Sequence, residues 1–381
     1  MKLIHNRDCN SIKGIFAHGK HLVSIGILLA AIVFSSPCNA EELRILCWEG
    51  YAPSQYTKRF ERFVKEKYDI DLVVTAINVS DPQEFFDSIR GRSADLISPA
   101  HNIPKSDRWP FIRGKIVLPV DLDNIPNYKH IVPELQKGEY ITRDNKVYGV
   151  PIVYGPYGLA YNTNIVKEEP ASWNVLWDPE YAGEYAISAD YHEANIYITA
   201  LASGLTRERM FDPDIEFLVT REFRERLHTL AKNARAFWIG VDTADTLQGL
   251  ALATAWGFSF PDLKKRGEVW KMAQPKEGTT GWVDNWMIGY SLKDKPLMKR
   301  IAEEWINYSI GPEMQVGYIR NLAQCPVNLS IKHLLRSEEI ETYHLNDPDY
   351  LKKLILWAPL SRRQVNAFKK LWLEAIGKPA N

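Results

Sequence analysis

Strand-like and helix-like patterns alternate along residues 43–98, and this alternation limits the fold more than any other feature of the sequence. The apolar runs LRILC, DLVVTAI and ADLIS, at 43–47, 71–77 and 94–98, are typical of strands. Such alternation predicts a parallel sheet with helices on both faces. In these sheets ligands bind beyond the C-terminal ends of the strands, which is where CWEGY and SPAHN lie.

Two helices are expected between these strands. The first, QYTKRFERFVKEK at 55–67, is expected to present Tyr56, Phe60, Phe63 and Val64 on one face. The second, SDPQEFFDSIR, starts with Asp81 as its N-cap and Pro82 at its first helical position.

The texture of the sequence changes at residue 146. The stretch KVYGVPIVYGPYGLAYN, at 146–162, is rich in β-formers, glycine and proline, and it predicts extended strands that link two lobes. A second α/β set follows. Its expected helices lie at 171–177, 191–204, 214–233, 295–309 and 361–376, and its expected strands at 183–188, 235–240, 252–258, 269–275 and 281–291.

These elements predict a two-lobed α/β fold with hinge strands and a ligand cleft between the lobes. We expect the first lobe to comprise residues 41–154 and 285–330, and the second to comprise 155–284 and 331–381. A chain of 381 residues, 45% of them apolar, is long enough for two domains of ordinary size. We expect it to be a monomer.

Residues 1–40 predict a signal peptide. Four basic residues precede an apolar run at 22–34, which has the length that signal peptides use. Small residues then end at Ala40, and cleavage there would export the rest of the chain to a periplasm. An uncleaved anchor is the alternative, although 13 residues are short for spanning a bilayer.

Cys47 and Cys325 would remain after that cleavage. An oxidising compartment allows a disulfide between them. Two buried free thiols are the other alternative. The sequence does not give the distance between the two residues, so both alternatives stay open.

Charge and motifs argue against several classes of function. Lys and Arg number 47 and so do Asp and Glu, so the formal net charge of zero indicates neither a nucleic-acid partner nor a polybasic membrane anchor. The sequence contains no P-loop, no Gly-x-Ser-x-Gly, no His-Glu-x-x-His and no Gly-x-Gly-x-x-Gly. His192 and Glu193 are adjacent, without the spacing of metal ligands. We therefore expect no catalysis, no metal and no cofactor.

Aromatic residues and carboxylates gather at four predicted strand ends and helix starts: Trp48–Tyr51, Asp190–Glu193, Trp256 and Trp282–Asp284. An ammonium group over the face of a Trp or Tyr ring gains about 0.5–2 kcal/mol, and a carboxylate adds a charge-assisted hydrogen bond. A cleft that closes on unpaired carboxylates costs several kcal/mol per ion, roughly, and a cationic ligand removes this cost. The pattern therefore predicts a site for an organic cation with amine ends and an apolar spine.

Each of these signals also has a structural alternative. Asp190 and Glu193 have the spacing of a capping box, Trp256 could belong to the core, and Asp284 could be a turn residue. The two aromatic residues after the first strand could pack between sheet and helix. Paired carboxylates also occur in glycosidases. Each residue alone is therefore ambiguous. Only their arrangement together, at strand and helix ends that face the other lobe, favours a binding site.

Several longer motifs carry a resemblance to a known family. The segments are CWEGYAPS, SWNVLWDPEYAGEYAIS, DYHE and GWVD, which start at residues 47, 172, 190 and 281. They resemble segments of the periplasmic spermidine/putrescine-binding proteins of polyamine ABC transporters, and the similarity covers nearly the whole chain after residue 40. The resemblance implies a type II periplasmic binding protein fold that binds a polyamine. The ligand contacts that it implies are Trp48, Tyr51, Asp190, Glu193, Trp256, Trp282 and Asp284.

The sequence departs from the family's pattern at the positions that would contact one end of the ligand. The family's acid before the first-strand tyrosine is replaced here by Gly50, and its Ser and Tyr after the third strand correspond to Ala100 and Asn102. A C-terminal Gln contact falls on Ala358. The expected replacements at this end are Glu49, His101 and Asp242. The ligand's length therefore stays open among putrescine, spermidine and norspermidine.

The resemblance also implies a membrane partner that recognises the liganded form. One alternative is delivery of the polyamine to an ABC transporter permease. The other is sensing, in which the protein docks on the periplasmic domain of a membrane signalling receptor of the cyclic-di-GMP type and controls biofilm. The replaced residues at one end of the ligand argue for divergence from the family's transport proteins. They do not decide between the two alternatives.

Overall fold

The structure, a computed structural model, describes residues 40–211 and 216–378, so the predicted signal peptide lies outside it except for its last residue. The chain from Ala40 onward forms one compact unit. Most of its strands belong to a single mixed sheet of 12 strands. No helix within the described residues has the length and apolarity that crossing a membrane requires.

The beginning of this unit folds as the alternation predicts. Strand β1 (Glu41–Cys47) pairs in parallel with β2 (Leu72–Asn78) on one side and with β3 (Leu96–Ile97) on the other. The helices between these strands are α1 (Ser54–Tyr68) and α2 (Pro82–Arg90). Because the strands are parallel, the residues that follow β1 and β3 come to the same edge of the sheet.

The two helices confirm the expected faces and caps. Helix α1 buries three of the four predicted apolar residues, and the fourth, Phe63, is 38% exposed. At the start of α2, the Asp81 carboxylate accepts the amide proton of Gln83 at 2.7 Å. The Glu84 side chain in turn accepts the amide proton of Asp81 at 2.9 Å, which completes a capping box.

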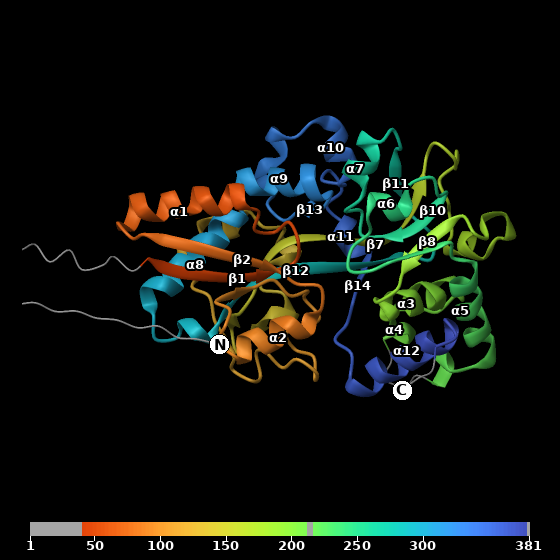
Figure 1. Cartoon of the computed structure of the whole chain (residues 1–381), viewed down its shortest axis with the longest axis horizontal. Coiled ribbons are helices and arrows are strands. Elements are labelled where there is room, and N and C mark those ends of the chain that lie inside the picture. Colours follow the sequence, from red (N-terminus) through yellow and green to blue (C-terminus); the bar gives the residue numbers. More distant parts are fainter. Residues whose placement is uncertain (1–39, 212–215, 379–381) are drawn as a thin grey trace, which may run out of the picture. The chain divides into compact units, whose positions relative to one another are not determined.

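Two long strands join the two ends of the sheet. Strands β7 (Val150–Asn162) and β12 (Thr279–Gly289) pair antiparallel, with a register shift between Asp284 and Asn285. Strand β12 also pairs with β3, whereas β7 also pairs with β10 (Leu252–Ala255). The predicted crossing strands are therefore confirmed, and Figure 1 shows both running through the middle of the unit.

The second end of the sheet is completed by shorter strands. The sheet order is β2-β1-β3-β12-β7-β10-β8-β9, with β4, β11, β13 and β14 paired alongside β7 or β12. Their bounds are β4 (Val117–Leu118), β8 (Tyr185–Ser188), β9 (Ala236–Trp238), β11 (Trp270–Met272), β13 (Cys325–Pro326) and β14 (Leu354–Leu356). A separate hairpin consists of β5 (Thr142–Arg143) and β6 (Lys146–Val147).

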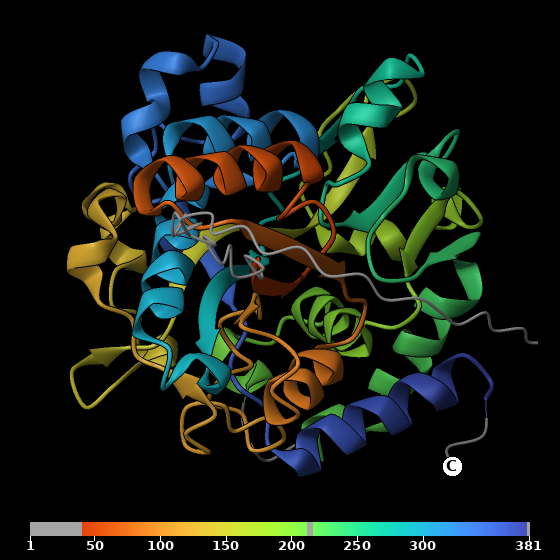
Figure 2. The ribbon, with the colours of Figure 1, turned by 60° about the vertical axis from the view of Figure 1, so that its left-hand side comes forward.

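Helices pack around both ends of this sheet. Helix α1 packs near α8 (Pro296–Ser309) and α9 (Pro312–Leu322) at the end formed by β1 and β2, as Figure 2 shows. Helices α3 (His192–Ala202), α5 (Arg221–Asn233) and α12 (Arg362–Ala375) pack against one another at the other end. The short helices are α4 (Arg207–Met210), α6 (Ala244–Leu247), α7 (Phe260–Lys265), α10 (Ser337–Thr342) and α11 (Tyr350–Lys353).

Two expected helices differ from the prediction. The segment expected as a helix at 171–177 is a 3₁₀ helix at Trp173–Trp177. The long helix expected at 214–233 is instead a 3₁₀ turn at Glu216–Leu218 followed by α5. Thr220 separates the two, because its hydroxyl accepts the amide proton of Phe223 at 3.3 Å and so starts α5.

The two cysteines in the described residues are not bonded. Cys47 ends β1, Cys325 starts β13, and both are buried free thiols. Burial raises the pKa of each thiol to about 12. Of the two alternatives that the sequence left open, the structure has the pair of buried thiols and not the disulfide.

A buried ion pair ties β1 to the residues that follow β12. Asp95 is 1% exposed, and its carboxylate accepts hydrogen bonds from Arg44 Nε at 2.9 Å and Nη2 at 2.7 Å. The hydroxyl of Ser291 donates to the same carboxylate at 2.7 Å. Burial alone would raise the pKa of Asp95, but these hydrogen bonds hold it below its usual value.

Asp95→Asn should therefore lower the free energy of unfolding at pH 7 by about 2–3 kcal/mol, because it leaves Arg44 without its partner. Arg44 is partly solvated, which brings the loss below the range of about 3–5 kcal/mol for fully buried pairs. Since the pKa of Asp95 is lowered by folding, the difference between wild type and variant should shrink as the pH falls below about 4.

Urea unfolding followed by circular dichroism at pH 7 and at acidic pH measures both effects. Asp107→Asn is the matched control, since Asp107 pairs with Arg113 in the open at 3.3 Å and should cost less than about 0.5 kcal/mol. Equal losses in the two variants would contradict a structural role for the buried pair.

Candidate functional site

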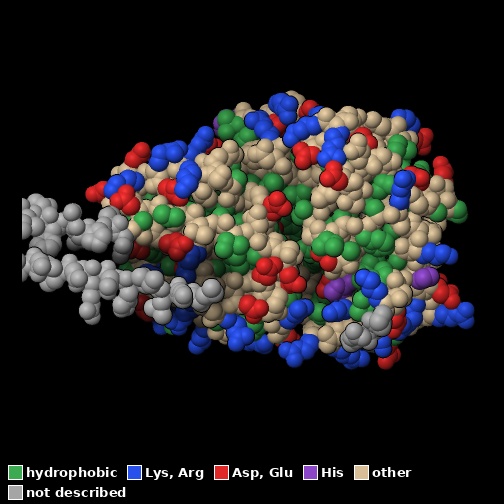
Figure 3. Space-filling view, viewed as in Figure 1, with side chains coloured by type: hydrophobic (Ala, Val, Ile, Leu, Met, Phe, Trp, Pro, Cys, Tyr) green, Lys and Arg blue, Asp and Glu red, His purple; other side chains and the backbone are tan. Residues whose placement is uncertain are grey.

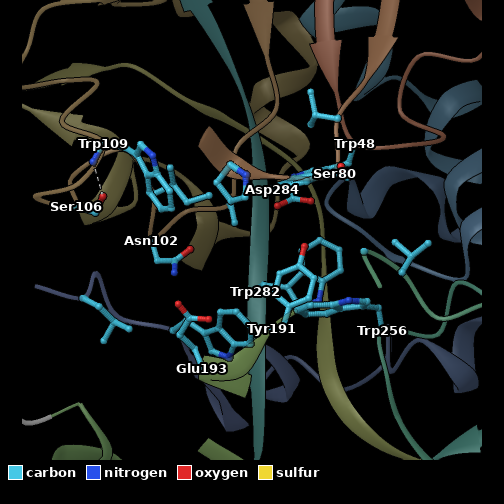
Figure 4. A pocket seen from close by; sticks show the side chains of 18 of the residues that line it. Trp48, Ser80, Asn102, Ser106, Trp109, Tyr191, Glu193, Trp256, Trp282 and Asp284 are labelled. Atoms are coloured by element: carbon cyan, nitrogen blue, oxygen red, sulfur yellow. Dashed lines mark hydrogen bonds between the residues drawn. The ribbon is translucent and has the colours of Figure 1, made fainter. Parts of the chain in front are cut away.

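Segments from both ends of the sheet enclose a cavity of about 280 Å³. Figure 3 shows a hollow near the middle of one face with acidic side chains beside it, and Figure 4 shows the side chains that line the cavity. The structure brings together seven of the ten expected binding residues in this wall. They are Trp48, Glu49, Tyr51, Glu193, Trp256, Trp282 and Asp284.

Strand β12 carries two of these side chains into the cavity. Trp282 and Asp284 are two positions apart, so they point to the same face of the strand, and the bulge follows directly after Asp284. The carboxylate of Asp284 is buried, with 5% of the residue exposed, and it accepts the hydroxyl proton of Tyr51 at 2.6 Å. The carbonyl of Tyr51 accepts the hydroxyl proton of Tyr318 at 3.0 Å, which fixes the tyrosine in place.

Burial decides the protonation of Asp284. It raises the pKa of the carboxyl group to about 8, although the hydrogen bond from Tyr51 acts in the opposite direction. At neutral pH this group therefore carries a proton unless a positive charge lies beside it. A buried acid with such a pKa is a feature of functional sites.

Aromatic rings form the wall that faces Asp284. The centroids of Trp256 and Trp282 are 5.8 Å apart with their planes at 87°, and those of Trp256 and Tyr191 are 5.1 Å apart at 81°. Trp48 packs edge-on against Phe85 at 5.0 Å. Figure 4 shows Trp48 next to Asp284, with Tyr191, Trp256 and Trp282 as the neighbouring wall. This arrangement offers ring faces to an apolar or cationic group.

Several acidic side chains lie close enough to Tyr191 to raise its pKa. Burial raises the pKa of the Tyr191 hydroxyl, and four acidic residues raise it further when they are ionised, in decreasing order Asp190, Asp284, Glu193 and Asp81. Each of them disfavours a negative charge on the ring oxygen. The same field attracts a cation into the cavity.

Glu193 stands at the start of α3 with a histidine beside it. The Nε2 atom of His192 lies 3.2 Å from Oε1 of Glu193. Burial lowers the pKa of His192, but the carboxylate of Glu193 more than offsets this and the net shift is upward. Burial likewise would raise the pKa of Glu193, whereas His192 and, more weakly, Arg108 bring it below its usual value. Glu193 is therefore a carboxylate at neutral pH.

Asp190 lies outside the cavity wall. Its carboxylate accepts the hydroxyl proton of Ser188 at 2.9 Å and the amide proton of Gly240 at 2.9 Å, so it ties the end of β8 to the loop after β9. The alternative of a capping box is not formed either, because the N-cap of α3 is Tyr191 and no side chain caps the helix. Ligand contact by Asp190 stays a prediction that these bonds do not favour.

His101 and Asp242 also stand behind the wall. His101 is 4% exposed, its Nδ1 atom accepts the amide proton of Val283 at 3.2 Å, and burial lowers its pKa to about 4. Asp242 is buried, and its carboxylate accepts the amide protons of Trp256 at 2.8 Å and of Ser259 at 3.0 Å. The neutral imidazole supports β12, and Asp242 holds the loop that carries Trp256.

The backbone at Gly50 does not favour the acid that the resemblance implies before Tyr51. Its φ is +85°, a conformation that side chains rarely adopt, and a Cβ atom there would lie 2.5 Å from Cδ2 of Leu322. An acidic side chain at this position would be strained and would displace Leu322. Glu49, one residue earlier, is exposed and lines the cavity instead.

Sequence reasoning missed several residues of the wall. They are Ser106, Arg108, Trp109, Tyr191, Tyr197, Phe258, Trp357 and Leu360, and Asn102 was identified only as a departure from the family. Trp357 follows directly after the short strand β14, so its place at a strand end was a usable signal. The loop that carries Arg108 and Trp109 has no such pattern in the sequence.

Curated relatives match most of the chain. The spermidine/putrescine-binding periplasmic protein 1 of Haemophilus influenzae is 25% identical over 299 residues, which is 77% of each chain. The spermidine/putrescine-binding periplasmic protein of Salmonella typhimurium is 22% identical over 324 residues, or 84% of this chain and 87% of that protein.

Solved structures match the fold. The spermidine/putrescine ABC transporter substrate-binding protein of Streptococcus pneumoniae superposes with a TM-score of 0.71 at 20% identity, over 88% of this chain and 98% of that one. This likeness confirms the predicted two-lobed α/β fold of type II binding proteins. Residues 92–354 match the family described as bacterial extracellular solute-binding protein. The chain therefore belongs to the bacterial extracellular solute-binding protein family, and it is a binding protein and not an enzyme.

Proposed function

We propose that this protein binds a polyamine in the cavity between its two lobes and presents it to an ABC transporter permease. The observation that carries the proposal is the buried carboxyl group of Asp284, which has a raised pKa and lies among the rings of Trp48, Tyr191, Trp256 and Trp282. Such a group is costly as an isolated ion and is stabilised by an ammonium ion beside it.

Other ligand classes suit this wall less well. Glu49, Glu193 and Asp284 contribute three carboxylates, and Arg108 is the single Lys or Arg side chain in the part of the wall that the structure describes. An anion would meet these acidic groups, and a neutral sugar would leave the charge of Glu49 and Glu193 without compensation. A chain of methylene groups with ammonium ions matches both the rings and the acids.

The expected pose places one ammonium group beside Asp284, under the face of Trp48. The aliphatic chain then runs along Trp282 towards Glu193, whose carboxylate receives a second ammonium group. Spermidine, norspermidine and putrescine all fit this description. The names of the relatives from Haemophilus and Salmonella support spermidine and putrescine, and norspermidine is the related triamine.

Location and partner follow from the same relatives. They are periplasmic proteins by name, and the predicted signal peptide at residues 1–40 would bring this chain to the periplasm. The hinge strands β7 and β12 would let the lobes close on the ligand. A permease that binds the closed form better than the open one then receives the polyamine.

A sensor is the second candidate output. It would dock the liganded protein on the periplasmic domain of a membrane signalling receptor, and the observation that favours it is Gly50, where the backbone excludes the acid of the transport relatives. Uptake of radiolabelled polyamine in a deletion strain separates the two. Lost uptake supports transport, and unchanged uptake with an altered cyclic-di-GMP level supports sensing.

Calorimetric titration tests the binding itself. The purified chain from residue 41 onward, stripped of ligand by mild unfolding and dialysis, is titrated with putrescine, spermidine and norspermidine. Binding with a micromolar or lower Kd to at least one of them is expected. No heat and no thermal stabilisation with any of the three would overturn the proposed ligand class.

Asp284→Asn should weaken binding by about 1.5–3 kcal/mol, the range for a hydrogen bond to a charged group, or roughly 10- to 150-fold in Kd. Asp294→Asn is the matched control, since it removes the same charge from an exposed position outside the cavity wall. Calorimetry of both variants checks the difference. If Asp284→Asn bound as tightly as the control, Asp284 would have no part in ligand binding.

Binding should also release a proton. With a pKa of about 8, Asp284 is mostly protonated at pH 7 without ligand, and the ammonium group favours the carboxylate. Affinity should therefore rise by up to about tenfold per pH unit between pH 6 and 7 and level off above pH 8. Titrations at pH 7 in buffers of different ionisation enthalpy count the released proton. Asp284→Asn should abolish the release, and a wild type that releases none would contradict the assignment.

A further inference from the structure

One side of the cavity differs chemically from the side near Asp284. Asn102, Ser106, Arg108 and Trp109 line it. In Figure 4, Asn102, Ser106 and Trp109 lie together on the far side of the cavity from Trp256. We call these four residues the basic end. It offers the donors of a guanidinium, an amide and a hydroxyl, and it contains no carboxylate.

The guanidinium at this end is held on a fixed support. The Arg108 guanidinium lies 4.4 Å from the centroid of the Trp109 ring. The indole nitrogen of Trp109 donates to Oε1 of Gln83 at 2.9 Å, and its backbone amide donates to the Ser106 hydroxyl oxygen at 3.0 Å. Trp109 is thus fixed at both its ring and its backbone, and Ser106 keeps its own hydroxyl proton for another acceptor.

The positive charge of Arg108 reaches the cavity. Arg108 is one of the factors that lower the pKa of Glu193, which stands in the opposite wall. Arg113, five residues further along the chain, instead forms a solvent-exposed ion pair with Asp107. Among the described residues, no carboxylate forms an ion pair with Arg108, so its donors stay available to a ligand.

We propose that the basic end receives an uncharged oxygen acceptor, so that the preferred ligand is a polyamine with an amide at one terminus, that is, a mono-N-acylated polyamine. This inference rests on the proposed function, and it names the ligand class of the same site. Arg108 is then a residue that determines specificity.

A terminal ammonium group does not suit the basic end. A guanidinium offers five N–H donors and no acceptor, so it cannot accept from an ammonium group. Two like charges about 6 Å apart at an effective dielectric constant of about 40 repel each other enough to weaken binding about tenfold. An amide carbonyl instead accepts hydrogen bonds from Arg108 and Ser106.

A carboxylate terminus suits the cavity less well than an amide. The negative charge of a carboxylate would face Glu193, which stands close enough to Arg108 to feel its charge. When a bound ammonium group ionises Asp284, the three carboxylates of the wall and the one guanidinium leave two negative charges. A triamine with one acylated end carries two positive charges and balances them.

Calorimetric titration of the wild-type chain compares spermidine with N-acetylspermidine and putrescine with N-acetylputrescine. The expected result is that N-acetylspermidine binds more tightly than spermidine. Spermidine that binds as tightly as or more tightly than N-acetylspermidine overturns the inference and leaves the proposed function intact. No binding of any amine overturns both. 6-Aminohexanoate carries a carboxylate at one end. If it bound more tightly than either acetylated amine, the inference that the basic end receives an uncharged group would also be overturned.

Variants test whether Arg108 sets this preference. Arg108→Glu should shift the ratio of the two dissociation constants by at least about tenfold towards spermidine, with Arg108→Gln between it and wild type. Arg113→Glu, on the same loop and outside the wall, is the control and should leave the ratio within twofold. Circular dichroism checks that all variants fold, which is expected because Arg108 is exposed. An unchanged ratio in Arg108→Glu would overturn the assignment.

Discussion

The antiparallel pairing of β7 with β12 is the constraint on which the rest of the structure depends. It runs from Val150 opposite Trp286 to Tyr157 opposite Thr280. Strand β12 pairs further with β3 at one end of the sheet, and β7 pairs further with β10 at the other. The bulge after Asp284 interrupts this ladder beside the cavity, where such irregularities re-aim side chains. The same two strands therefore join the two lobes, and β12 places the buried carboxyl group of Asp284 in the cavity wall.

Patterns within short stretches of the sequence made the first strands and helices, and part of the site, predictable. The alternation of β1, α1, β2, α2 and β3 follows from apolar spacing, and Asp81 with Pro82 marks the start of α2 by rules that act within four residues. The site was predictable where it follows strand ends, since Trp48, Tyr51 and Trp256 lie there. Asp284, inside a strand, was identified through the cluster Trp282–Asp284 and through the GWVD segment that resembles the family.

The roles of the other site residues depend on contacts with residues that are distant in the sequence, and the spacing of residue types along the chain does not encode such contacts. Asp190 has the position of a cap, but its carboxylate binds the amide of Gly240, which is 50 residues away. His101 is held against Val283 in β12. Arg108 lies in a loop without periodicity, and its orientation depends on Trp109. The sequence could indicate which residue types were present at these positions, but not which partner each would bind.

The two buried thiols have a consequence for how this protein withstands its surroundings. Oxidants and disulfides react with the thiolate, and a pKa of about 12 leaves roughly one thiolate in 10⁵ at pH 7 for Cys47 and for Cys325. Members of an extracellular family meet oxidising conditions throughout their lifetime. Within the described residues, the two thiols are thus protected from oxidants by burial and not by a cross-link. Its stability depends on packing, hydrogen bonds and ion pairs such as Arg44–Asp95, and no disulfide between Cys47 and Cys325 restrains the described residues.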